Sequence, residues 1–380
     1  MKNILYVVST TKFYSGAEWS LFRLVQNLKD KVHVHFVLPD RGELFKKCLA
    51  TGIPATVIQY IPTGTRALSF PSIFLYFFVN AIYALRLVFL ILKARIDIVH
   101  INEIYNFPAL VSAGISGART VCHVRAGVLP SPTLRHLTLK VLNTFARRII
   151  WVSNGVKKAW QPGAQILKKS SVVHNVHPGT ARFNPSKYKA IEKDHIVVGM
   201  ISKFNRQKGH ENLVRAAAKI REIGVENIRY SIVGGLMRGH EKYYKYIVGL
   251  IKSLNLDSEF TLHGMSEDVP QLLSEMDIFV HPTDCEDAFP TVVLEAMMMK
   301  KPVICFDRGG ISEQFEHGVS GILVPAGDIN RLAEEIVRLS RDTDARKSLG
   351  DEAREHVLET LGGDNIARAV LNVYHSFFDS

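Results

Sequence analysis

The chain has 380 residues, and 47% of them are hydrophobic, so it is long and apolar enough for two domains with separate cores. Its formal net charge of +11 favours anionic partners, which include nucleotide phosphates, nucleic acid and an anionic membrane leaflet. The four cysteines are scattered without the spacing of metal ligands, which excludes a cysteine-based metal site and indicates a reducing compartment.

Apolar runs alternate with helical stretches along the first half, and this alternation predicts a parallel, doubly wound α/β sheet. The first run, residues 3–9, is too short for the core of a signal peptide, so we interpret it as a strand and expect a cytoplasmic protein. A loop at 10–16 and a helix at 17–28 follow. Within a first domain of residues 1–181, further strands are expected at 32–38, 55–59, 97–101, 119–124 and 149–152.

Residues 70–92 form a strongly apolar stretch in which Arg86 is the one charged residue. The stretch is long enough to span a membrane. Spanning would, however, place the strands before and after it on opposite sides of the bilayer, where they cannot share one sheet. We therefore favour a crossover helix that is either buried or partly sunk in a membrane face. Lys93 and Arg95 suit anionic headgroups, so a peripheral position on the inner face of the membrane stays open.

Polar side chains stand at the carboxyl ends of two strands of the expected first sheet. His100, Asn102 and Glu103 stand at the end of one strand, and His123 and Arg125 at the end of another. In an open α/β sheet the carboxyl ends of the strands face the ligand crevice, so we predict that both groups line it. A structural role for each histidine is the alternative.

A polar segment at 182–195, which contains Pro185, is interpreted as a linker to a second domain of residues 196–363. In this domain the basic turn at 202–209 lies between a strand at 196–201 and a helix at 210–221. Because a helix amino terminus attracts anions, Lys203, Arg206 and Lys208 predict a clamp for a diphosphate. A solvated basic turn is the alternative. Further strands are expected at 229–233, 260–264, 277–281 and 303–306.

An acidic loop joins the strand at 277–281 to a helix at 291–299. Asp287 on the loop and Glu295 on the helix are eight residues apart, and both are expected to face the crevice. Thr291 is placed to cap the helix. The alternative is that Asp287 caps a turn and Glu295 is solvated.

In combination these stretches resemble the retaining, nucleotide-sugar-dependent glycosyltransferases of family 4. Asp-Ala-Phe-Pro at 287–290 and Glu-Ala-Met at 295–297 are similar to the acidic signature of the family. Ser-Lys-Phe at 202–204 replaces the family's Gly-Arg-Leu, and Lys-Gly at 208–209 is retained. Ser-Gly-Ala-Glu at 15–18 resembles the family's Gly-Gly-Ala-Glu, and Gly-Gly at 309–310 its later glycine pair.

The resemblance implies the GT-B fold, in which two Rossmann-like domains face each other across a cleft, with the helix at 364–380 packed back on the first domain. It implies transfer of a sugar from a nucleotide diphosphate sugar, with a UDP-sugar as the expected donor, to a glycan or lipid-linked acceptor, without a metal or other cofactor. The implied catalytic residues are Lys203, Lys208, His123 and Asp287. The implied donor site contains Gly16, Lys203, Lys208, His263, Gly264, Asp287, Ala288, Phe289, Pro290, Thr291 and Glu295. The implied acceptor site contains His100, Asn102, Glu103, His123 and Arg125.

Two other functions remain as alternatives. A nucleotide-sugar epimerase on the same fold shares the phosphate clamp but needs no acceptor. A nucleic-acid-binding protein is disfavoured, because the basic residues are dispersed and no RNA-binding or zinc motif is present.

Overall fold

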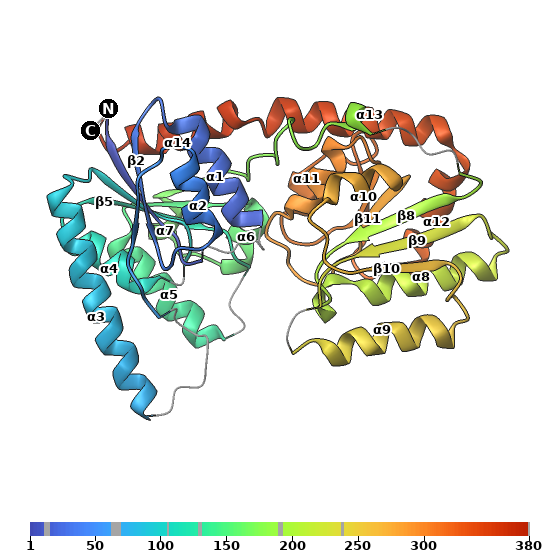
Figure 1. The fold of residues 1–380 in the computed structure, drawn as a ribbon, viewed down its shortest axis with the longest axis horizontal. Coiled ribbons are helices and arrows are strands. Elements are labelled where there is room, and N and C mark those ends of the chain that lie inside the picture. Colours follow the sequence, from blue (N-terminus) through green and yellow to red (C-terminus); the bar gives the residue numbers. More distant parts are fainter. Residues whose placement is uncertain are drawn as a thin grey trace. The chain divides into compact units, whose positions relative to one another are not determined.

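The computed structural model describes residues 1–10, 16–61, 70–104, 106–127, 131–188, 193–236 and 239–378. It divides the chain into two compact units, Met1–Val176 with Gly363–Ser380 and His177–Gly362 (Figure 1). The division therefore follows Val176 rather than residue 181. Residues 182–188 of the expected linker belong to the second unit, and residues 189–192 lie outside the described residues. Most of the loop expected at 10–16, including Ser15, also lies outside them.

The first unit is built on a parallel sheet of seven strands, which confirms the parallel sheet predicted for this half and adds one strand, β7 (Ser170–Val172), to the six expected. Its strands are β1 (Asn3–Val7), β2 (His33–Leu38), β3 (Ala55–Val57), β4 (Ile98–Ile101), β5 (Arg119–Val124), β6 (Arg148–Trp151) and β7 (Ser170–Val172). Their order across the sheet is β3-β2-β1-β4-β5-β6-β7. Alternation of strand and helix produces this order, because a parallel strand can be reached only by a crossover.

Helices cover both faces of the first sheet (Figure 1). On one face α3 packs on α4, and α4 packs on α5. On the other face α1 packs on α14, the last helix of the chain. The helices are α1 (Gly16–Leu28), α2 (Glu43–Ala50), α3 (Phe70–Lys93), α4 (Phe107–Ile115), α5 (Pro132–Phe145), α6 (Asn154–Trp160), α7 (Ala164–Leu167) and α14 (Gly363–His375).

The second unit repeats this plan with a six-stranded parallel sheet. Its strands are β8 (Ile196–Ile201), β9 (Ile228–Val233), β10 (Phe260–His263), β11 (Ile278–His281), β12 (Val303–Phe306) and β13 (Ile322–Val324). Its helices are η1 (Pro185–Lys187), η2 (Arg206–Lys208), α8 (His210–Glu222), α9 (Glu241–Ser253), α10 (Val269–Glu275), α11 (Thr291–Met298), η3 (Ile311–Glu313), α12 (Ile329–Arg341) and α13 (Thr343–Thr360). The core lies between the sheet and these helices and includes Val198, Ile232, Ile278 and Ile304.

Each sheet has one point at which the strand order reverses direction. The order in the second unit is β10-β9-β8-β11-β12-β13, so the reversal falls between β8 and β11; in the first unit it falls between β1 and β4. Loops leaving two such strands run to opposite faces of the sheet and leave a crevice at the carboxyl ends. The candidate functional residues are expected at the carboxyl ends of the strands next to these two reversal points.

Helix α3 buries one side and exposes large apolar side chains on the other. Tyr83 and Leu87 are buried, whereas Phe77 is 66% and Leu85 72% exposed. Leu75–Lys93 is the one span within the described residues that is long and apolar enough to cross a membrane, and 22% of it is buried. Because β3 and β4 belong to one sheet, α3 is the crossover between them. The exposed apolar side chains contradict the alternative in which this crossover helix is buried.

Candidate active site

The second unit brings Lys208 and Asp287 together at its reversal point. Lys208 ends η2, the turn that follows β8, and Asp287 lies on the loop that follows β11. Lys208 Nζ donates to Asp287 Oδ2 at 2.5 Å, and His281 Nε2 lies 3.4 Å from the same oxygen. Neither the lysine nor the carboxylate is fully exposed. The predicted clamp residue and the predicted sugar-binding acid thus form one cluster in this structure.

The electrostatics of this cluster keep both partners charged. Burial alone would raise the pKa of Asp287, but His281 and Lys208 together bring it below its usual range. Burial alone would likewise lower the pKa of Lys208, and the negative charge of Asp287 raises it instead. An ammonium group has three donors, so Lys208 can hold Asp287 and still donate to a phosphate oxygen.

Two glycines allow the loops around this pair to pack closely. Gly209 has a φ of 78°, and a Cβ there would lie 1.7 Å from the carbonyl oxygen of Pro282. Gly309 has a φ of 62°, and its Cβ would lie 2.1 Å from the carbonyl oxygen of Asp287. Gly310 N donates to that same carbonyl oxygen at 2.8 Å. The glycine pair at 309–310 therefore supports the acidic loop through the backbone.

Replacement of Gly209 by alanine is expected to destabilise the protein much more than replacement of Gly224. Both glycines have a positive φ, which costs an alanine about 1–2 kcal/mol, but only Gly209 would also clash with the backbone of Pro282. The free energy of unfolding, measured in urea, checks this difference. Equal destabilisation by the two variants would contradict the close contact between the two loops.

Glu295 lies in the middle of α11 and is partly buried. Burial raises its pKa to about 7, and the positive charge of Arg182 offsets this effect only in part. The prediction that Thr291 caps this helix is wrong. It is the first helical residue, and Pro290, which precedes it, makes no side-chain capping bond. Gln314 Nε2 instead donates to the carbonyl oxygen of Pro290 at 2.9 Å and holds the start of α11.

The other predicted donor residues take separate positions. Lys203 follows β8, so it lies at the carboxyl edge of the sheet, as Lys208 does. His263 is the last residue of β10, the edge strand, and Gly264 follows it. Ala288, Phe289 and Pro290 connect Asp287 to α11, and Phe289 is buried. Gly16 begins α1 in the first unit.

Sequence reasoning missed His281. It ends β11 and carries a buried side chain that contacts Asp287, although the sequence suggested only the last residue of an apolar strand. Its position one residue before the turn was the available signal, because the final residue of a strand adjoins the loop that follows it.

In the first unit the predicted acceptor residues belong to a buried hydrogen-bond network. Arg125, which is 8% exposed, donates through Nε to Asn102 Oδ1 at 2.8 Å, and through Nη1 to Asn175 Oδ1. Its Nη2 lies 3.3 Å from His123 Nδ1, and His100 Nε2 also lies 3.3 Å from that atom. The side chains of both strand ends therefore meet, as their positions in the sequence indicated.

Donor and acceptor roles in this network follow from the arginine. Since a guanidinium only donates, His123 Nδ1 must be an acceptor, and His100 Nε2 must carry a proton. His100 Nδ1 then accepts from the hydroxyl of Tyr374, 2.7 Å away, whose oxygen accepts from Tyr6 at 2.7 Å. Tyr374 belongs to α14, so the last helix of the chain supplies part of this network.

Both histidines are neutral in this environment. Burial, helped by the charge of Arg125, lowers the pKa of His100 to about 3 and that of His123 well below its usual range. His100, His123 and Asn102 are fully buried, so they lie behind the crevice surface rather than on it. Glu103 is partly buried; burial and then the charge of Glu18 raise its pKa to about 7. Arg125 and Glu103 are the predicted acceptor residues nearest to solvent.

Two family descriptions together match most of the chain. "Glycosyltransferase Family 4" matches residues 14–176, and "Glycosyl transferases group 1" matches residues 182–356. The first match lies within the first unit and the second match within the second unit.

Two curated relatives share moderate sequence identity with this chain over about half of its length. N-acetyl-alpha-D-glucosaminyl L-malate synthase of Bacillus anthracis is 28% identical over 188 residues, which are 50% of this chain and 47% of that protein. The capsular polysaccharide biosynthesis glycosyltransferase CapM of Staphylococcus aureus is 25% identical over 191 residues, which are 50% of this chain and 49% of that protein. The matches thus span about half the length of these curated relatives.

A solved structure matches over the whole length. The crystal structure of Anabaena Alr3699/HepE in complex with UDP has a TM-score of 0.80 and 21% sequence identity, and the match covers 99% of this chain and 100% of that one. At this identity the likeness concerns the fold alone.

Proposed function

The chain belongs to the group 1 glycosyltransferases of family 4 and has their GT-B fold, and from this premise we propose that it moves a sugar from UDP to a hydroxyl with retention of configuration. The acceptor is a glycan or a lipid-linked sugar of polysaccharide or glycoconjugate synthesis. The polysaccharide role of CapM supports this acceptor class, and the UDP bound to HepE supports the donor.

One observation carries the proposal: Lys208 and Asp287 meet where the sheet order reverses, beside the amino terminus of α8. This is the edge at which open α/β sheets bind nucleotides. A diphosphate placed here is adjacent to a positive side chain, a helix amino terminus and a carboxylate. The carboxylate then faces the sugar attached to the diphosphate.

The chemistry follows from these charges. The bond between the anomeric carbon and the diphosphate oxygen breaks, the acceptor oxygen bonds to the same carbon, and the acceptor's proton leaves toward the departing diphosphate. Lys203 and Lys208 stabilise the negative charge that develops on the diphosphate, a role worth roughly 3–4 kcal/mol per donor at a transition state. Asp287 binds sugar hydroxyls and Glu295 binds the ribose hydroxyls. The lysines supply the positive charge, so the proposal needs no metal ion or cofactor.

Incubation of the protein with a panel of UDP-sugars and glycan acceptors tests the proposal. A new glycoside that keeps the anomeric configuration of the donor, identified from its NMR coupling constant, is expected. Conversion of a UDP-sugar without any acceptor would instead indicate an epimerase. Inversion at the anomeric carbon would overturn the retaining mechanism.

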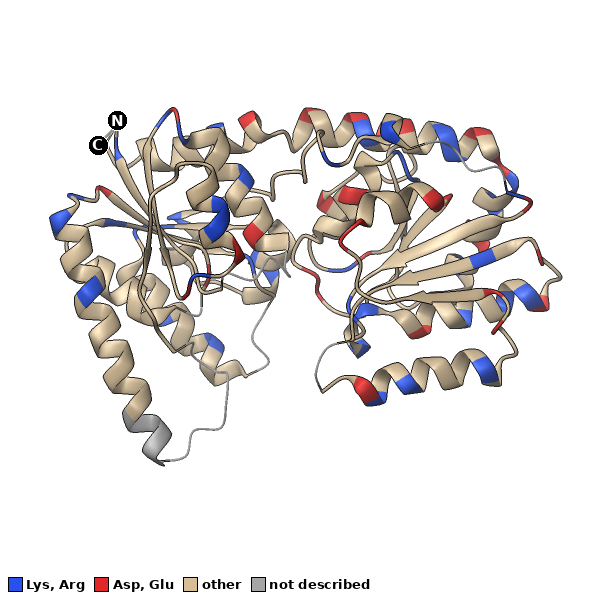
Figure 2. Cartoon of the chain, viewed as in Figure 1, with Lys and Arg blue, Asp and Glu red and all other residues tan. Residues whose placement is uncertain are grey.

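We further propose that the exposed side of α3 rests on an anionic membrane surface on the cytoplasmic side. Leu75, Phe78, Leu85, Phe89 and Leu92 recur at helical spacing and are all exposed. Between residues 70 and 96 there is no acidic residue, whereas Arg86, Lys93 and Arg95 are basic. Figure 2 shows α3 largely without charge, while basic residues elsewhere are spread over both units. Apolar contact combined with positive charge favours a lipid surface over a second copy of a chain that carries +11.

Replacement of both Phe77 and Phe78 by serine is expected to reduce flotation of the protein with vesicles that contain phosphatidylglycerol. The two rings are 66% and 56% exposed, so their removal takes apolar contact from the membrane and little from the protein core. The matched control replaces Ile223 and Met265, two exposed residues of the second unit, by serine and should leave flotation unchanged. Unchanged flotation, or a concentration-dependent dimer that the serine variant loses, would exclude the membrane role.

A further inference from the structure

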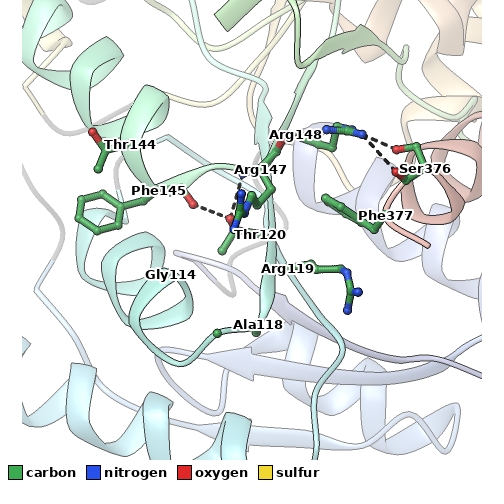
Figure 3. Close-up of a pocket in the computed structure, with 11 residues that line it drawn as sticks. Gly114, Ala118, Arg119, Thr120, Thr144, Phe145, Arg147, Arg148, Ser376 and Phe377 are labelled. Atoms are coloured by element: carbon green, nitrogen blue, oxygen red, sulfur yellow. Dashed lines mark hydrogen bonds between the residues drawn. The ribbon is translucent and has the colours of Figure 1, made fainter. Parts of the chain in front are cut away.

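A pocket of about 660 Å³ opens in the first unit at the amino-terminal ends of β5 and β6 (Figure 3). We call it the arginine pocket, because Arg119, Arg147 and Arg148 line it. The candidate acceptor residues lie at the opposite, carboxyl ends of the strands. Since β5 has six residues, roughly 20 Å of strand separates Arg119 from Arg125. The arginine pocket is therefore a separate site.

Hydrogen bonds hold its walls in place. Thr120 Oγ1 donates to the carbonyl oxygen of Phe145 at 2.5 Å and accepts from Arg147 N at 3.0 Å, which joins β5 to the end of α5. Arg148 donates through Nε to Ser376 Oγ at 3.0 Å and through Nη2 to the Ser376 carbonyl oxygen at 3.2 Å. Figure 3 shows these bonds on either side of the pocket. The site is thus largely preformed.

Two of the arginines retain donors for a ligand. Arg119 Cζ lies over the ring of Phe378, 4.2 Å from its centre, and among the described residues no group accepts a hydrogen bond from this guanidinium. Arg147 is exposed at the pocket. None of the 11 described residues that line the pocket is acidic.

A fourth basic side chain, Lys169, offsets the negative charge of the carbonyl oxygens at the end of α5, next to the pocket. Lys169 Nζ donates to the carbonyl oxygens of Asn143 at 2.6 Å and Ala146 at 2.8 Å, so it neutralises the negative end of α5. Burial lowers the pKa of Lys169, and the positive charge of Arg147 lowers it further. An anion in the pocket would offset the positive charge of Arg147.

We propose that the arginine pocket binds a phosphate-bearing anion, distinct from the sugar donor. Guanidinium groups match phosphate oxygens with paired N–H donors, and they stay charged at all physiological pH values. The volume lies within the range of small-molecule sites and exceeds what inorganic phosphate alone needs. A glycerol phosphate group fits both requirements. Such a group occurs in soluble phosphate esters and in lipid headgroups.

Calorimetric titration of the full chain with sn-glycerol 3-phosphate tests the proposal. Binding is expected to weaken roughly tenfold in Arg147→Gln, because one charge-assisted contact is lost, and further in Arg119→Gln/Arg147→Gln. Arg41→Gln, an exposed arginine of the same unit, is the control and should bind as the wild type does. The side chain of Arg147 is exposed, so its variant is expected to fold normally even if the double variant does not.

Two further arms locate the bound phosphate and its source. Lys208→Ala should bind glycerol phosphate as the wild type does; a loss of binding there would mean that the phosphate occupies the donor site and would overturn the proposal. Vesicles with and without phosphatidylglycerol, mixed with the Phe77→Ser/Phe78→Ser protein, test the lipid source. Binding of the vesicles that depends on Arg147, without binding of the soluble ester, would assign a lipid headgroup. If neither binding of the soluble ester nor binding of the vesicles depends on Arg147, the proposal is overturned.

Discussion

Replacement of Lys208 by alanine is expected to lower turnover with a UDP-sugar by roughly 100- to 1,000-fold, the usual effect of removing one donor that stabilises a developing negative charge. The structure adds an effect on stability. Without Lys208, the largely buried carboxylate of Asp287 loses its closest positive partner, while His281 Nε2 still lies 3.4 Å away. Because an unpaired buried charge is costly, the free energy of unfolding should fall by up to about 3 kcal/mol. Steady-state kinetics and urea unfolding measure the two effects.

A second variant separates catalysis from folding. Lys208→Ala/Asp287→Asn removes both charges, so most of the lost stability should return while turnover stays low. Arg215→Ala, which breaks an exposed ion pair on α8, is the control and should change neither quantity much. If the double variant regains turnover together with stability, Lys208 has a structural role and the proposed diphosphate clamp is wrong.

Replacement of Glu295 by glutamine is expected to stabilise the unliganded protein above neutral pH. The pKa of Glu295 is raised from 4.5 to about 7, so between these values the folded chain binds more protons than the unfolded chain. The free energy of unfolding therefore falls as the pH rises from 4.5 to 7, and the loss is complete above 7. At 1.36 kcal/mol per unit of pKa, the wild type loses at most about 3 kcal/mol, which the glutamine variant keeps.

The same substitution should weaken UDP binding by roughly tenfold, because a charged acceptor for the ribose hydroxyls becomes neutral. Urea unfolding between pH 4 and pH 8 and calorimetry with UDP test the two effects independently. Glu352→Gln, at an exposed position of α13, is the control. A stability difference that does not change with pH would refute the account based on burial, and equal UDP affinity would refute the ribose role.

The architecture was largely predictable because parallel strands covered by helices on both sides are uniformly apolar. Runs such as the one at 303–306 are recognisable without any tertiary information. The strands that were missed, β7 and β13, have three residues each and lie at the edges of their sheets. Short edge strands carry too little pattern to be distinguished from loops.

The candidate donor site was predictable in part. Lys208 and Asp287 are 79 residues apart, yet each follows a strand next to the reversal point, and strand ends of a parallel sheet share one edge. The ion pair between them was not predictable. It depends on loop conformations that Gly209 and Gly309 permit, and local sequence does not specify the distance between two such loops.

The first unit shows where sequence reasoning fails. Position near the carboxyl end of a strand indicated that His100 and His123 face a crevice, but alternate side chains of a strand point to opposite faces. Tyr374, 274 residues after His100, completes the network that buries both rings. No sequence pattern around His100 predicts a hydrogen-bond partner so distant in the chain.

Because α14 completes the first unit, a ribosome must synthesise the whole second unit before the first unit can close. The second unit is continuous from His177 to Gly362, so all of its residues are made before α14. Until α14 is made, Tyr6 and His100 lack their partner Tyr374, and the face of the first sheet that α14 covers stays open to solvent. The half of the protein that is made first is therefore the half that is completed last.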